Sequence, residues 1–517
     1  MNKTTRRISI GCAVLVALGL GELRAEVKPN ALISEGAVLQ QKIRAPIWGT
    51  AKDGEKVTVE FQKQKVATIA TNGQWKVVLK PLRVGGPYTL KITGDNALVY
   101  TNILVGEVWI CSGQSNMQMG LGGCEGAKET IAQANDPMLR LFTVPNTAAD
   151  TPQADVRGNW CESATNTVGG FSGVAYYFGR DLRQALQVPV GLIHTSWGGS
   201  PAETWVPHDV LLADPMLKHI VEAHEQRVKA YPSQLEQYKQ AEPERKKKHD
   251  EAVEKAKAEG KYPPPVPAPP VDPAQYPHRP SALYNAMIAP LQPFAIRGAI
   301  WYQGESNAGR AYEYRTLFPT LIQSWRKTWG QGDFPFLFVQ IAPYGRTTYG
   351  TSAWAELREA QLLTSLKVPK TAMAVILDAG ECGNIHPVKK EPVGARLALA
   401  ARAIAYGQGI EYSGPQYHSM KVDGDRVTLT FTHVGGGLVA KDGELKGFTI
   451  AGADQKFVGA KAEIKGNRIV VWSPDVKQPV AVRYGWADCP SVNLFNKQGI
   501  PASSFRTDDF PMATKPK

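Results

Sequence analysis

Four short segments of the chain combine hydroxyl, imidazole, carboxylate and amide side chains, and each follows an apolar run of strand length. They are Gly113-Gln-Ser-Asn116, Thr195-Ser-Trp-Gly-Gly-Ser-Pro-Ala-Glu-Thr-Trp205, Trp301-Tyr-Gln-Gly-Glu-Ser-Asn307 and Asp378-Ala-Gly-Glu-Cys-Gly-Asn-Ile-His-Pro387. A serine hydroxyl is a weak nucleophile and needs a neighbouring base to take its proton. These segments therefore contain the residue types that serine-dependent ester hydrolysis requires.

Ser115 is the candidate nucleophile, because it follows the apolar run Val105–Ile110 at a turn rich in small and amide residues. His386 is the best candidate for the base among the nine histidines, since it follows a strand end and lies just downstream of two carboxylates. A carboxylate can hold an imidazole in the required tautomer and stabilise its cation. The sequence thus predicts a hydroxyl–imidazole pair at the edge of a sheet.

The tetrahedral oxyanion of such a reaction needs preorganised hydrogen-bond donors. The candidates are a backbone N–H of Gly198 or Gly199 and the side-chain amide of Gln303. Two other kinds of site are disfavoured. The Gly-x-Ser-x-Gly elbow of ordinary α/β hydrolases is broken by Met117, and no glycine-rich phosphate loop with its lysine occurs.

The region that carries these segments alternates between strand and helix patterns. Apolar runs recur at Val105–Ile110, Leu139–Val144, Val188–Trp197, Ile296–Tyr302, Phe334–Ile341 and Thr371–Asp378. Helical patterns lie between several of them, at Val174–Leu186, Tyr312–Trp325, Ala353–Leu366 and Val393–Tyr406. This alternation predicts an α/β fold with a parallel sheet covered on both faces. Ligands of such sheets bind at the carboxyl ends of the strands, where all four segments are expected.

The flanking regions show β patterns, and one long segment interrupts the α/β region. We expect a β-sandwich over residues 26–104, a hydrolase domain over 105–408 and a second β-domain over 409–517. The interruption, at about residues 211–284, is first strongly charged and then proline-rich at Pro263–Pro270. We interpret it as a surface insertion in preference to a partner-binding motif.

The N-terminus has the layout of a secretory signal peptide. Lys3, Arg6 and Arg7 precede an apolar run over residues 8–20, which is too short for a confident membrane span. We therefore expect residues 1–25 to be removed and the mature chain to be exported, to the periplasm or the extracellular space, with no membrane span.

Charge and cysteine content limit which partners and which disulfides are expected. The chain carries a net charge of +12, but the basic residues are mixed with acidic ones, so a nucleic-acid partner is not expected. Removing the signal peptide leaves five cysteines, for which we predict the pairs Cys124–Cys161 and Cys382–Cys489. None has Cys-x-x-Cys spacing, and no metal site is predicted.

In this order the four segments resemble the sialate O-acetylesterase family, a branch of the SGNH-type hydrolases. The similarity covers nearly the whole mature chain, from Val105-Gly-Glu-Val-Trp-Ile-Cys-Ser-Gly-Gln-Ser-Asn-Met117 to Phe505-Arg-Thr-Asp508. The resemblance implies an SGNH-hydrolase-like parallel sheet flanked by helices. It also implies removal of acetyl groups from sugar hydroxyls, without a metal or an organic cofactor.

The resemblance assigns roles to residues of this chain. It makes Ser115 the nucleophile and His386 the general base. The Ser115 N–H, the Gly198-Gly199 turn and Gln303 would form the oxyanion hole.

The acid of the triad stays open, because the position three residues before the histidine is Gly383, where many SGNH relatives have Asp. Asp378 is the first choice and Glu381 the second, and a backbone carbonyl supporting the histidine is the third. Asn116 and Glu305 are expected to brace the site.

Several alternatives remain at this stage. Acetylated xylan or another polysaccharide competes with sialic acid as the substrate. A catalytically inactive carbohydrate-binding protein and an interaction scaffold are the rival functions. The aromatic residues near the motifs could pack in the core or form a sugar platform, and an arginine could meet the carboxylate of an acidic sugar; the residues concerned are Trp197, Trp205, Trp301, Tyr302, Arg297, Arg310 and Arg358.

Overall fold

Seven strands form the central sheet of the computed structural model, which describes residues 26–347 and 350–516. In spatial order they are β10 (Trp160–Ala164), β9 (Asn135–Thr143), β11 (Val190–Ser196), β8 (Ala97–Gly113), β12 (Gly298–Tyr302), β13 (Phe336–Val339) and β14 (Thr371–Ala374). All neighbours pair in parallel except β10, an antiparallel edge strand that the sequence did not predict. The predicted signal peptide lies outside the described residues.

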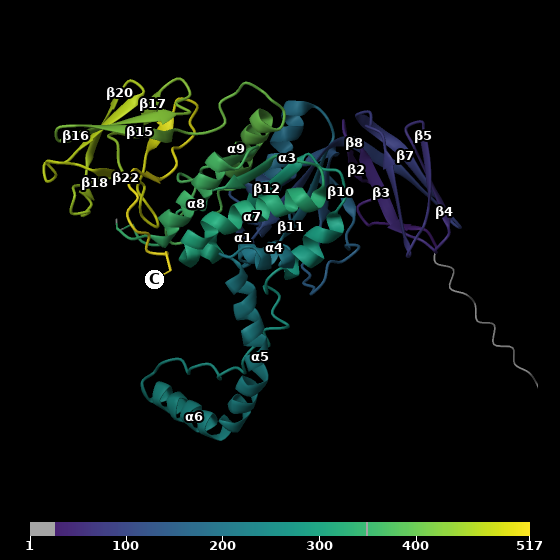
Figure 1. The fold of residues 1–517 in the computed structure, drawn as a ribbon, viewed down its shortest axis with the longest axis horizontal. Coiled ribbons are helices and arrows are strands. Elements are labelled where there is room, and N and C mark those ends of the chain that lie inside the picture. Colours follow the sequence, from purple (N-terminus) through teal and green to yellow (C-terminus); the bar gives the residue numbers. More distant parts are fainter. Residues whose placement is uncertain (1–25, 348–349, 517) are drawn as a thin grey trace, which may run out of the picture.

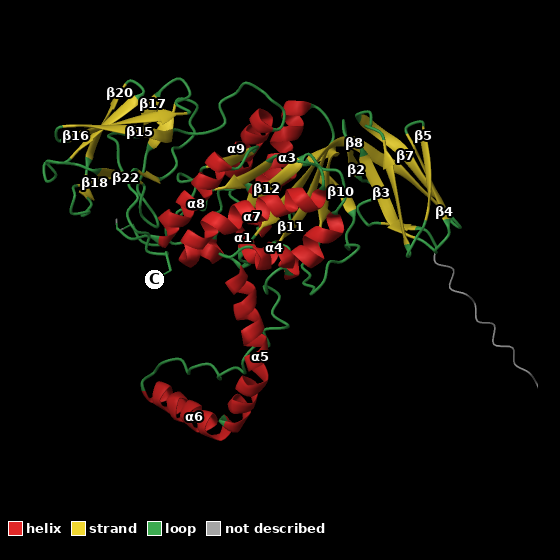
Figure 2. Cartoon of the chain, in the orientation of Figure 1, coloured by secondary structure: helices red, strands yellow, loops and turns green. Residues whose placement is uncertain are grey.

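Helices cover both faces of this sheet (Figures 1 and 2). α3 (Gly173–Leu186) and α9 (Glu391–Ile404) share one hydrophobic core with alternate residues of the strands, whereas α7 (Ala311–Trp329) and α8 (Ala353–Lys367) share the other. On β12, for example, Ala299 and Trp301 face α7, and Ile300 and Tyr302 face α3. Successive strand side chains point to opposite faces, so a strand buried on both sides reads as one continuous apolar run.

A β-sandwich precedes the sheet. Its strands are β1 (Lys28–Pro29), β2 (Val38–Gln40), β3 (Ala45–Thr50), β4 (Lys56–Phe61), β5 (Gln64–Ile69), β6 (Gln74–Leu79) and β7 (Gly85–Thr93). Alternating burial along β4 places Val57, Val59 and Phe61 in the core between two small sheets. The sandwich is continuous with the central sheet, because the 17-residue β8 pairs with β2 and β7 before it pairs with β11 and β12.

A second β-domain follows α9 and has its own hydrophobic core. Its strands are β15 (Gln416–Asp423), β16 (Arg426–Thr432), β17 (Leu438–Ala440), β18 (Phe448–Ala451), β19 (Val458–Gly459), β20 (Lys461–Lys465), β21 (Arg468–Trp472), β22 (Ala481–Tyr484), β23 (Leu494–Asn496) and β24 (Phe505–Arg506). They form antiparallel sheets in the orders β15-β16-β21-β20, β19-β18-β22-β24 and β17-β23. The mixed α/β fold with additional C-terminal sheets is thus confirmed.

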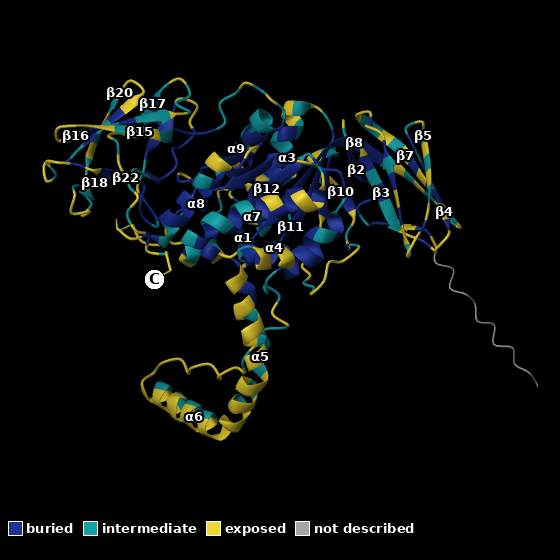
Figure 3. Ribbon diagram, in the orientation of Figure 1, coloured by how far each residue is buried: buried dark blue, intermediate teal, exposed yellow. Residues whose placement is uncertain are grey.

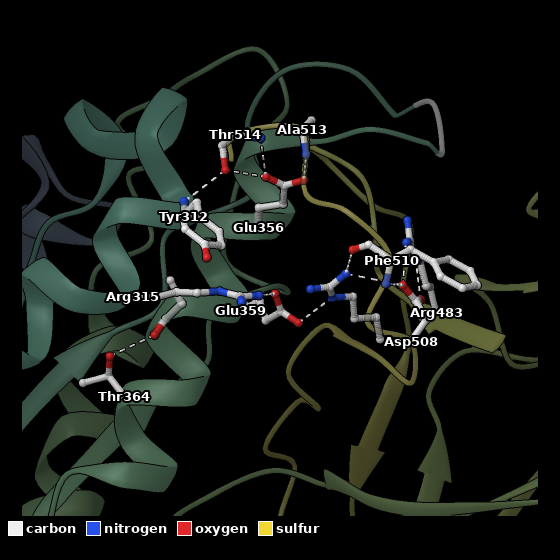
Figure 4. A network of polar contacts seen from close by, with 12 residues as sticks. Tyr312, Arg315, Glu356, Glu359, Thr364, Arg483, Asp508, Phe510, Ala513 and Thr514 are labelled. Atoms are coloured by element: carbon white, nitrogen blue, oxygen red, sulfur yellow. Dashed lines mark hydrogen bonds and ion pairs between the residues drawn. The ribbon is translucent and has the colours of Figure 1, made fainter. Parts of the chain in front are cut away.

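A network of ion pairs joins the C-terminal domain to the helices of the hydrolase region (Figure 4). Glu359 of α8 binds Arg315 of α7 and, at 2.7 Å, Arg506 of β24. Arg506 also contacts Asp508, which Arg483 binds through two hydrogen bonds of 2.8 Å. Because several of these charges are largely buried, each depends on its partners for compensation.

The insertion forms an arm that projects from the body of the molecule (Figure 1). After α4 (His208–Ala213), the chain runs outward as α5 (Lys218–Gln240), turns into α6 (Glu242–Ala258) and returns along the proline-rich segment. α5 is buried only near its base, at Ile220 and Val221, and α6 has no buried residue (Figure 3). Its charged side chains are therefore solvated, as a surface insertion requires.

The remaining helices are short: α1 (Ser115–Gln118) begins directly after β8, and α2 (Ala127–Ala132) follows it. Among the described residues, no helix combines the length and the apolar character needed to cross a bilayer.

Candidate active site

The strand register brings three of the four segments to one edge of the sheet. Gly113, at the end of β8, pairs with Ser196 at the end of β11 on one side and with Tyr302 at the end of β12 on the other. Parallel strands end at the same edge, so the turns that follow all face the same solvent region. Ser115, the Gly198-Gly199 turn and Gln303 are therefore neighbours.

Gly113 allows the sharp turn before Ser115. Its φ is +142°, a conformation that L side chains rarely adopt, and a Cβ there would lie 2.1 Å from the carbonyl oxygen of Tyr302. The turn leads directly into α1, whose first residue is the half-buried Ser115.

Ser115 and His386 form a hydrogen-bonded pair. The Nε2 of His386 lies 2.8 Å from the Oγ of Ser115, although 271 positions separate them in the chain. The His386 backbone N–H donates to the Oδ1 of Asn384 at 3.0 Å, which fixes the loop on which the imidazole is carried. The 2.8 Å between Nε2 and Oγ is within the range over which a base accepts a hydroxyl proton.

The environment of His386 favours the neutral imidazole. Partial burial lowers its pKa below the ordinary value of 6.5, and the positive charge of Lys390 lowers it further. At neutral pH the ring therefore has a free lone pair for the Ser115 proton. For Nε2 to accept that proton, the ring hydrogen must be on Nδ1.

Neither carboxylate upstream of His386 bonds to its ring. Asp378 binds Arg396 through both oxygens, at 2.6 and 2.7 Å. Glu381 accepts from the Val388 N–H at 3.2 Å and from Asn384, and so braces the loop instead of the imidazole. Within residues 26–347 and 350–516, no carboxylate makes a hydrogen bond or ion pair with His386.

Asn116 lies at the centre of a polar cluster behind the pair. Its amide nitrogen donates to Glu305 at 2.6 Å and to the carbonyl oxygen of Ile385 at 3.0 Å. Its Oδ1 accepts from the ammonium group of Lys390 at 2.5 Å. Asn116, which follows Ser115, thus connects that segment to Ile385, the residue before His386.

The two charged members of this cluster are removed from water. Burial raises the pKa of Glu305 and lowers the pKa of Lys390 to about 8, while the attraction between the two charges opposes both shifts. The Oε2 of Glu305 has no hydrogen-bond partner among the described residues. Lys390 is 1% exposed, and its ammonium group lies 5.1 Å from the centroid of the Tyr302 ring.

Two backbone N–H groups at or near Ser115 have no hydrogen-bond acceptor among the described residues. In the described part of the chain, nothing accepts a hydrogen bond from the N–H of Ser115 or of Gly199. Gly198 contacts the nucleophile, since a Cβ on it would lie 3.3 Å from the Cβ of Ser115. Its N–H, however, already donates to the Oε1 of Gln118 at 2.7 Å.

Gln303, the predicted side-chain donor, is fully buried and already bonded. Its Nε2 donates to Asn307 at 2.7 Å and to the carbonyl oxygen of Ser200 at 3.3 Å, and its Oε1 accepts from Tyr314 at 2.9 Å. In this arrangement Gln303 holds the turn after β11 against the turn after β12. It does not direct an N–H toward Ser115.

Most of the aromatic and arginine candidates are structural. Trp205, Trp301 and Tyr302 are fully buried, so they belong to the core. The three arginines are also engaged: Arg310 with Glu203 and Glu313, Arg358 with backbone carbonyls, and Arg297 with the carbonyl of Ala405. Trp197 alone is half-buried, with its ring against His278.

Comparison with known proteins identifies the family. The model of the family described as "carbohydrate esterase, sialic acid-specific acetylesterase" matches residues 105–253 and 274–398. The sialate O-acetylesterase of Rattus norvegicus is 34% identical over 413 residues, which is 72% of each chain. The human enzyme is 30% identical over 442 residues, or 78% of this chain and 75% of its own. The chain belongs to the sialic acid-specific acetylesterase family.

A solved structure of a carbohydrate acetylesterase from Xanthomonas citri has the same architecture. It superposes with a TM-score of 0.79 at 36% identity, covering 93% of this chain and all of the other. With the family match, this makes the protein an esterase, and the four segments recognised in the sequence belong to an esterase. The described residues contain no group of three or more His, Cys, Asp or Glu that could hold a metal ion.

The acetylesterase has an open cavity of about 380 Å³ at the base of the arm. Arg227 of α5 lines it together with His278 and Arg279 of the returning segment. His278 lies against the turn beside the nucleophile, because a Cβ on Gly199 would be 3.6 Å from its ring. The family model leaves out residues 254–273, so the last turn of α6 and the proline-rich stretch are additions to the shared fold, whereas α5 and most of α6 are matched.

The disulfide predictions have opposite outcomes. Cys382–Cys489 is present, with a Cα–Cα distance of 5.5 Å, and it ties the His386 loop to the C-terminal domain. The pair Cys124–Cys161 is wrong, since both thiols are free and bond separate carbonyl oxygens, those of Gly120 and Leu141.

Sequence reasoning missed three residues of the site: Lys390, Gln118 and His278. Lys390 reads as part of a charged helix start, and only its low exposure shows its role. Gln118 follows Ser115 by three positions, so its place in the first turn was a usable signal. His278 comes from the end of the insertion, and nothing local to it predicts contact with Gly199.

Proposed function

We propose that this esterase removes acetyl groups from sugar hydroxyls through a covalent acetyl-serine intermediate, with Ser115 as the nucleophile and His386 as its general base. The 2.8 Å separation between their side chains carries the proposal. The position of Ser115, in a turn at the carboxyl edge of a parallel sheet, also agrees with an SGNH-type arrangement.

The first half-reaction transfers the acetyl group to the enzyme. The Oγ of Ser115 attacks the acetyl carbonyl carbon while Nε2 of His386 takes the hydroxyl proton. The negative charge moves to the carbonyl oxygen, where the N–H groups of Ser115 and Gly199 donate. The C–O bond to the sugar then breaks, and the imidazolium returns its proton to the departing sugar oxygen.

The second half-reaction restores the serine. Water attacks the acetyl carbon, and His386 takes a proton from that water. The tetrahedral intermediate collapses to acetate, and the protonated imidazole returns a proton to the Oγ of Ser115. The net reaction consumes one water and releases one sugar hydroxyl and one acetic acid, which ionises to acetate and a proton.

We further propose that Ser115 and His386 work as a dyad whose imidazole is held by its loop. Asn384 and Glu381 fix the loop backbone, and Asn116 binds the carbonyl just before the histidine. Asp378 is committed to Arg396 and supplies no orienting bond to the ring. This differs from all three options that the sequence left open, because no carboxylate and no backbone carbonyl among the described residues bonds to the His386 ring.

Among the possible substrates, we favour acetylated sugars that carry a carboxylate. The cavity at the base of the arm supports this choice, because Arg227 has no carboxylate partner among the described residues and lies beside His278 and Arg279. The ring of His278 lies within about 14 Å of the Cβ of Ser115. This limit follows because Gly198 contacts Ser115, Gly199 contacts the His278 ring, and consecutive Cα atoms have a fixed spacing. Neutral acetylated xylan is the competing substrate.

We also propose that the enzyme is exported. The basic and apolar N-terminal segment supports this, as does the Cys382–Cys489 disulfide, which persists in oxidising compartments. A mature N-terminus near residue 26 in protein recovered from the periplasm or medium is the expected result, and an intact residue 1 in active protein would contradict it.

Release of acetate from acetylated sialosides, glucuronoxylan and neutral xylan tests the function and the substrate together. We expect Ser115→Ala to abolish release from all of them, with its far-UV circular dichroism unchanged. A Ser115→Ala protein of wild-type activity would refute the mechanism. Faster turnover of neutral xylan than of the acidic substrates would refute the substrate preference.

The rival function is that of a carbohydrate-binding protein without activity. A fluorophosphonate probe distinguishes the two, because it labels only a serine that is activated by a base. Labelling of the wild type but not of Ser115→Ala is the expected outcome. Absence of labelling in the wild type would favour the binding protein.

A further inference from the structure

Lys390 is buried at the point where the two catalytic segments meet. It precedes α9 and is 1% exposed, yet its ammonium group has one hydrogen bond to a side chain, the 2.5 Å bond to the Oδ1 of Asn116. A lysine is almost never fully buried without a compensating partner, because removing its charge from water is costly. The position of this charge therefore requires an explanation.

We propose that Lys390 is a positioning residue of the esterase, whose ammonium group fixes the Asn116 amide and thereby the segments that carry Ser115 and His386. An amide can present its oxygen or its nitrogen to a neighbour. With Lys390 donating to Oδ1, the nitrogen must face Glu305 and the Ile385 carbonyl. The inference rests on the proposed roles of Ser115 and His386.

The hydrogen bonds from Lys390 to Asn116 and from Asn116 to Ile385 each restrain the backbone next to a reacting group. Asn116 follows Ser115 within α1, and the Ile385 carbonyl belongs to the peptide unit that leads into His386. Rotation of the Asn116 amide would place its oxygen against that carbonyl oxygen, and two acceptors cannot bond. Loss of Lys390 therefore releases the His386 loop without removing any group that touches the substrate.

Lys390 also acts on His386 through its charge. The titratable groups around the His386 loop come from five segments: Glu381 and Lys389 on the loop itself, Glu305 after β12, Cys124 and Glu125 before α2, Asp378 paired with Arg396, and Lys390 before α9. Of these, Lys390 is the charged group that lowers the pKa of His386, by opposing a second positive charge nearby. A structural spacer would have no such effect on the imidazole.

The decisive measurement is the pH dependence of kcat/KM on 4-nitrophenyl acetate, in wild type, Lys390→Met and Lys389→Met. Methionine keeps an unbranched apolar stem and removes the charge. Lys389 is the matched control, since it is the adjacent lysine but is exposed. For Lys390→Met we expect kcat to fall at least about tenfold with KM within about twofold. We also expect the acid limb of the profile to move to higher pH, because the positive charge that lowers the pKa of His386 is gone.

Removal of Lys390 alone leaves Glu305 without its countercharge, so the single variant can fail to fold. Glu305→Gln/Lys390→Met avoids this by removing both charges, and circular dichroism establishes that it is folded. Because Glu305 does not contribute to the pKa shift of His386, the double variant should show the same upward movement of the acid limb.

An acid limb at the wild-type pH in the folded Lys390 variants would overturn the proposal, as would an equal shift in Lys389→Met. These outcomes are distinct from failure of the proposed function, which appears as undiminished activity of Ser115→Ala. A wild type that turns over the ester while Lys390→Met keeps its kcat and pH profile would refute the positioning role alone.

Discussion

Arg396 holds Asp378 through two parallel hydrogen bonds of 2.6 and 2.7 Å, in the fork geometry that makes arginine–carboxylate pairs specific. The same guanidinium donates to the Val375 carbonyl at 2.8 Å, just after β14. The pair therefore anchors the start of the His386 loop to α9. Its task is to hold the backbone that leads to the base.

Asp378→Asn tests this assignment. If Asp378 oriented the imidazole, its loss would cost about 10⁴ in kcat, as in a complete triad. Because it binds Arg396 instead, we expect kcat/KM on 4-nitrophenyl acetate to fall by less than about tenfold, through loosening of the loop. A loss of several thousandfold in a folded protein would restore Asp378 to the triad.

The pH profile of the wild type follows from the environment of His386. Its pKa lies below 6.5, and the proposed mechanism requires the neutral ring. Activity should therefore rise as pH increases through a midpoint below 6.5 and stay high at pH 7. A midpoint above 6.5 in kcat/KM would contradict the pKa depression that burial and Lys390 produce.

Arg227→Gln should weaken the binding of acidic substrates selectively. Removing an uncompensated charge from the cavity wall is expected to raise KM for acetylated sialosides by about tenfold, because one charge-assisted hydrogen bond to the substrate is lost. The rate on 4-nitrophenyl acetate should not change. Lys229→Gln, on the same helix but outside the cavity, is the control, and an equal effect there would indicate general electrostatics.

The outer arm should be dispensable for catalysis. Replacing residues 242–270 by a short Gly/Ser linker removes no buried side chain of α6. We predict that thermal stability stays within a few degrees and that activity on 4-nitrophenyl acetate stays within about twofold, because surface changes of this kind cost little. A large loss of either would show that the arm supports the active site directly.

The Cys382–Cys489 link should stabilise the fold. It closes a loop of 107 positions, and its loss through Cys382→Ala/Cys489→Ala is expected to cost about 2–4 kcal/mol in urea-induced unfolding. Cys161→Ala, at a free and partly exposed thiol, serves as the comparison. Equal unfolding curves for the two variants would contradict the expectation.

Local patterns in the sequence were sufficient to predict most helices and strands of the α/β core. The helices expected at Val174–Leu186 and Ala353–Leu366 form within one residue of those bounds, since α3 is amphipathic, most of α8 is buried, and each has a capping serine before it. The edge strand β10 was missed, because Trp160–Ala164 is short, contains Glu162 and Ser163, and gains its strand structure by pairing with β9.

The strand-end motifs also located Ser115, His386 and Asn116, because strand order brings them together. The hydrogen-bond partners of these and neighbouring side chains could not be predicted from the sequence. Whether Asp378 binds His386 or Arg396 depends on α9, which begins thirteen residues later and packs under the loop. Likewise the bonding of Gln303 depends on Asn307 and Tyr314, whose orientation only the tertiary structure defines.

β8 has a consequence for motion in this enzyme. Its backbone runs without interruption from the N-terminal sandwich, past β7 and β2, to the glycine that precedes Ser115. From Leu104 onward, neighbouring strands hold β8 along both edges. We therefore expect the sandwich and Ser115 to move together. Any adjustment that admits a bulky substrate therefore falls to the segments that meet this body from the other side, the His386 loop and the base of the arm.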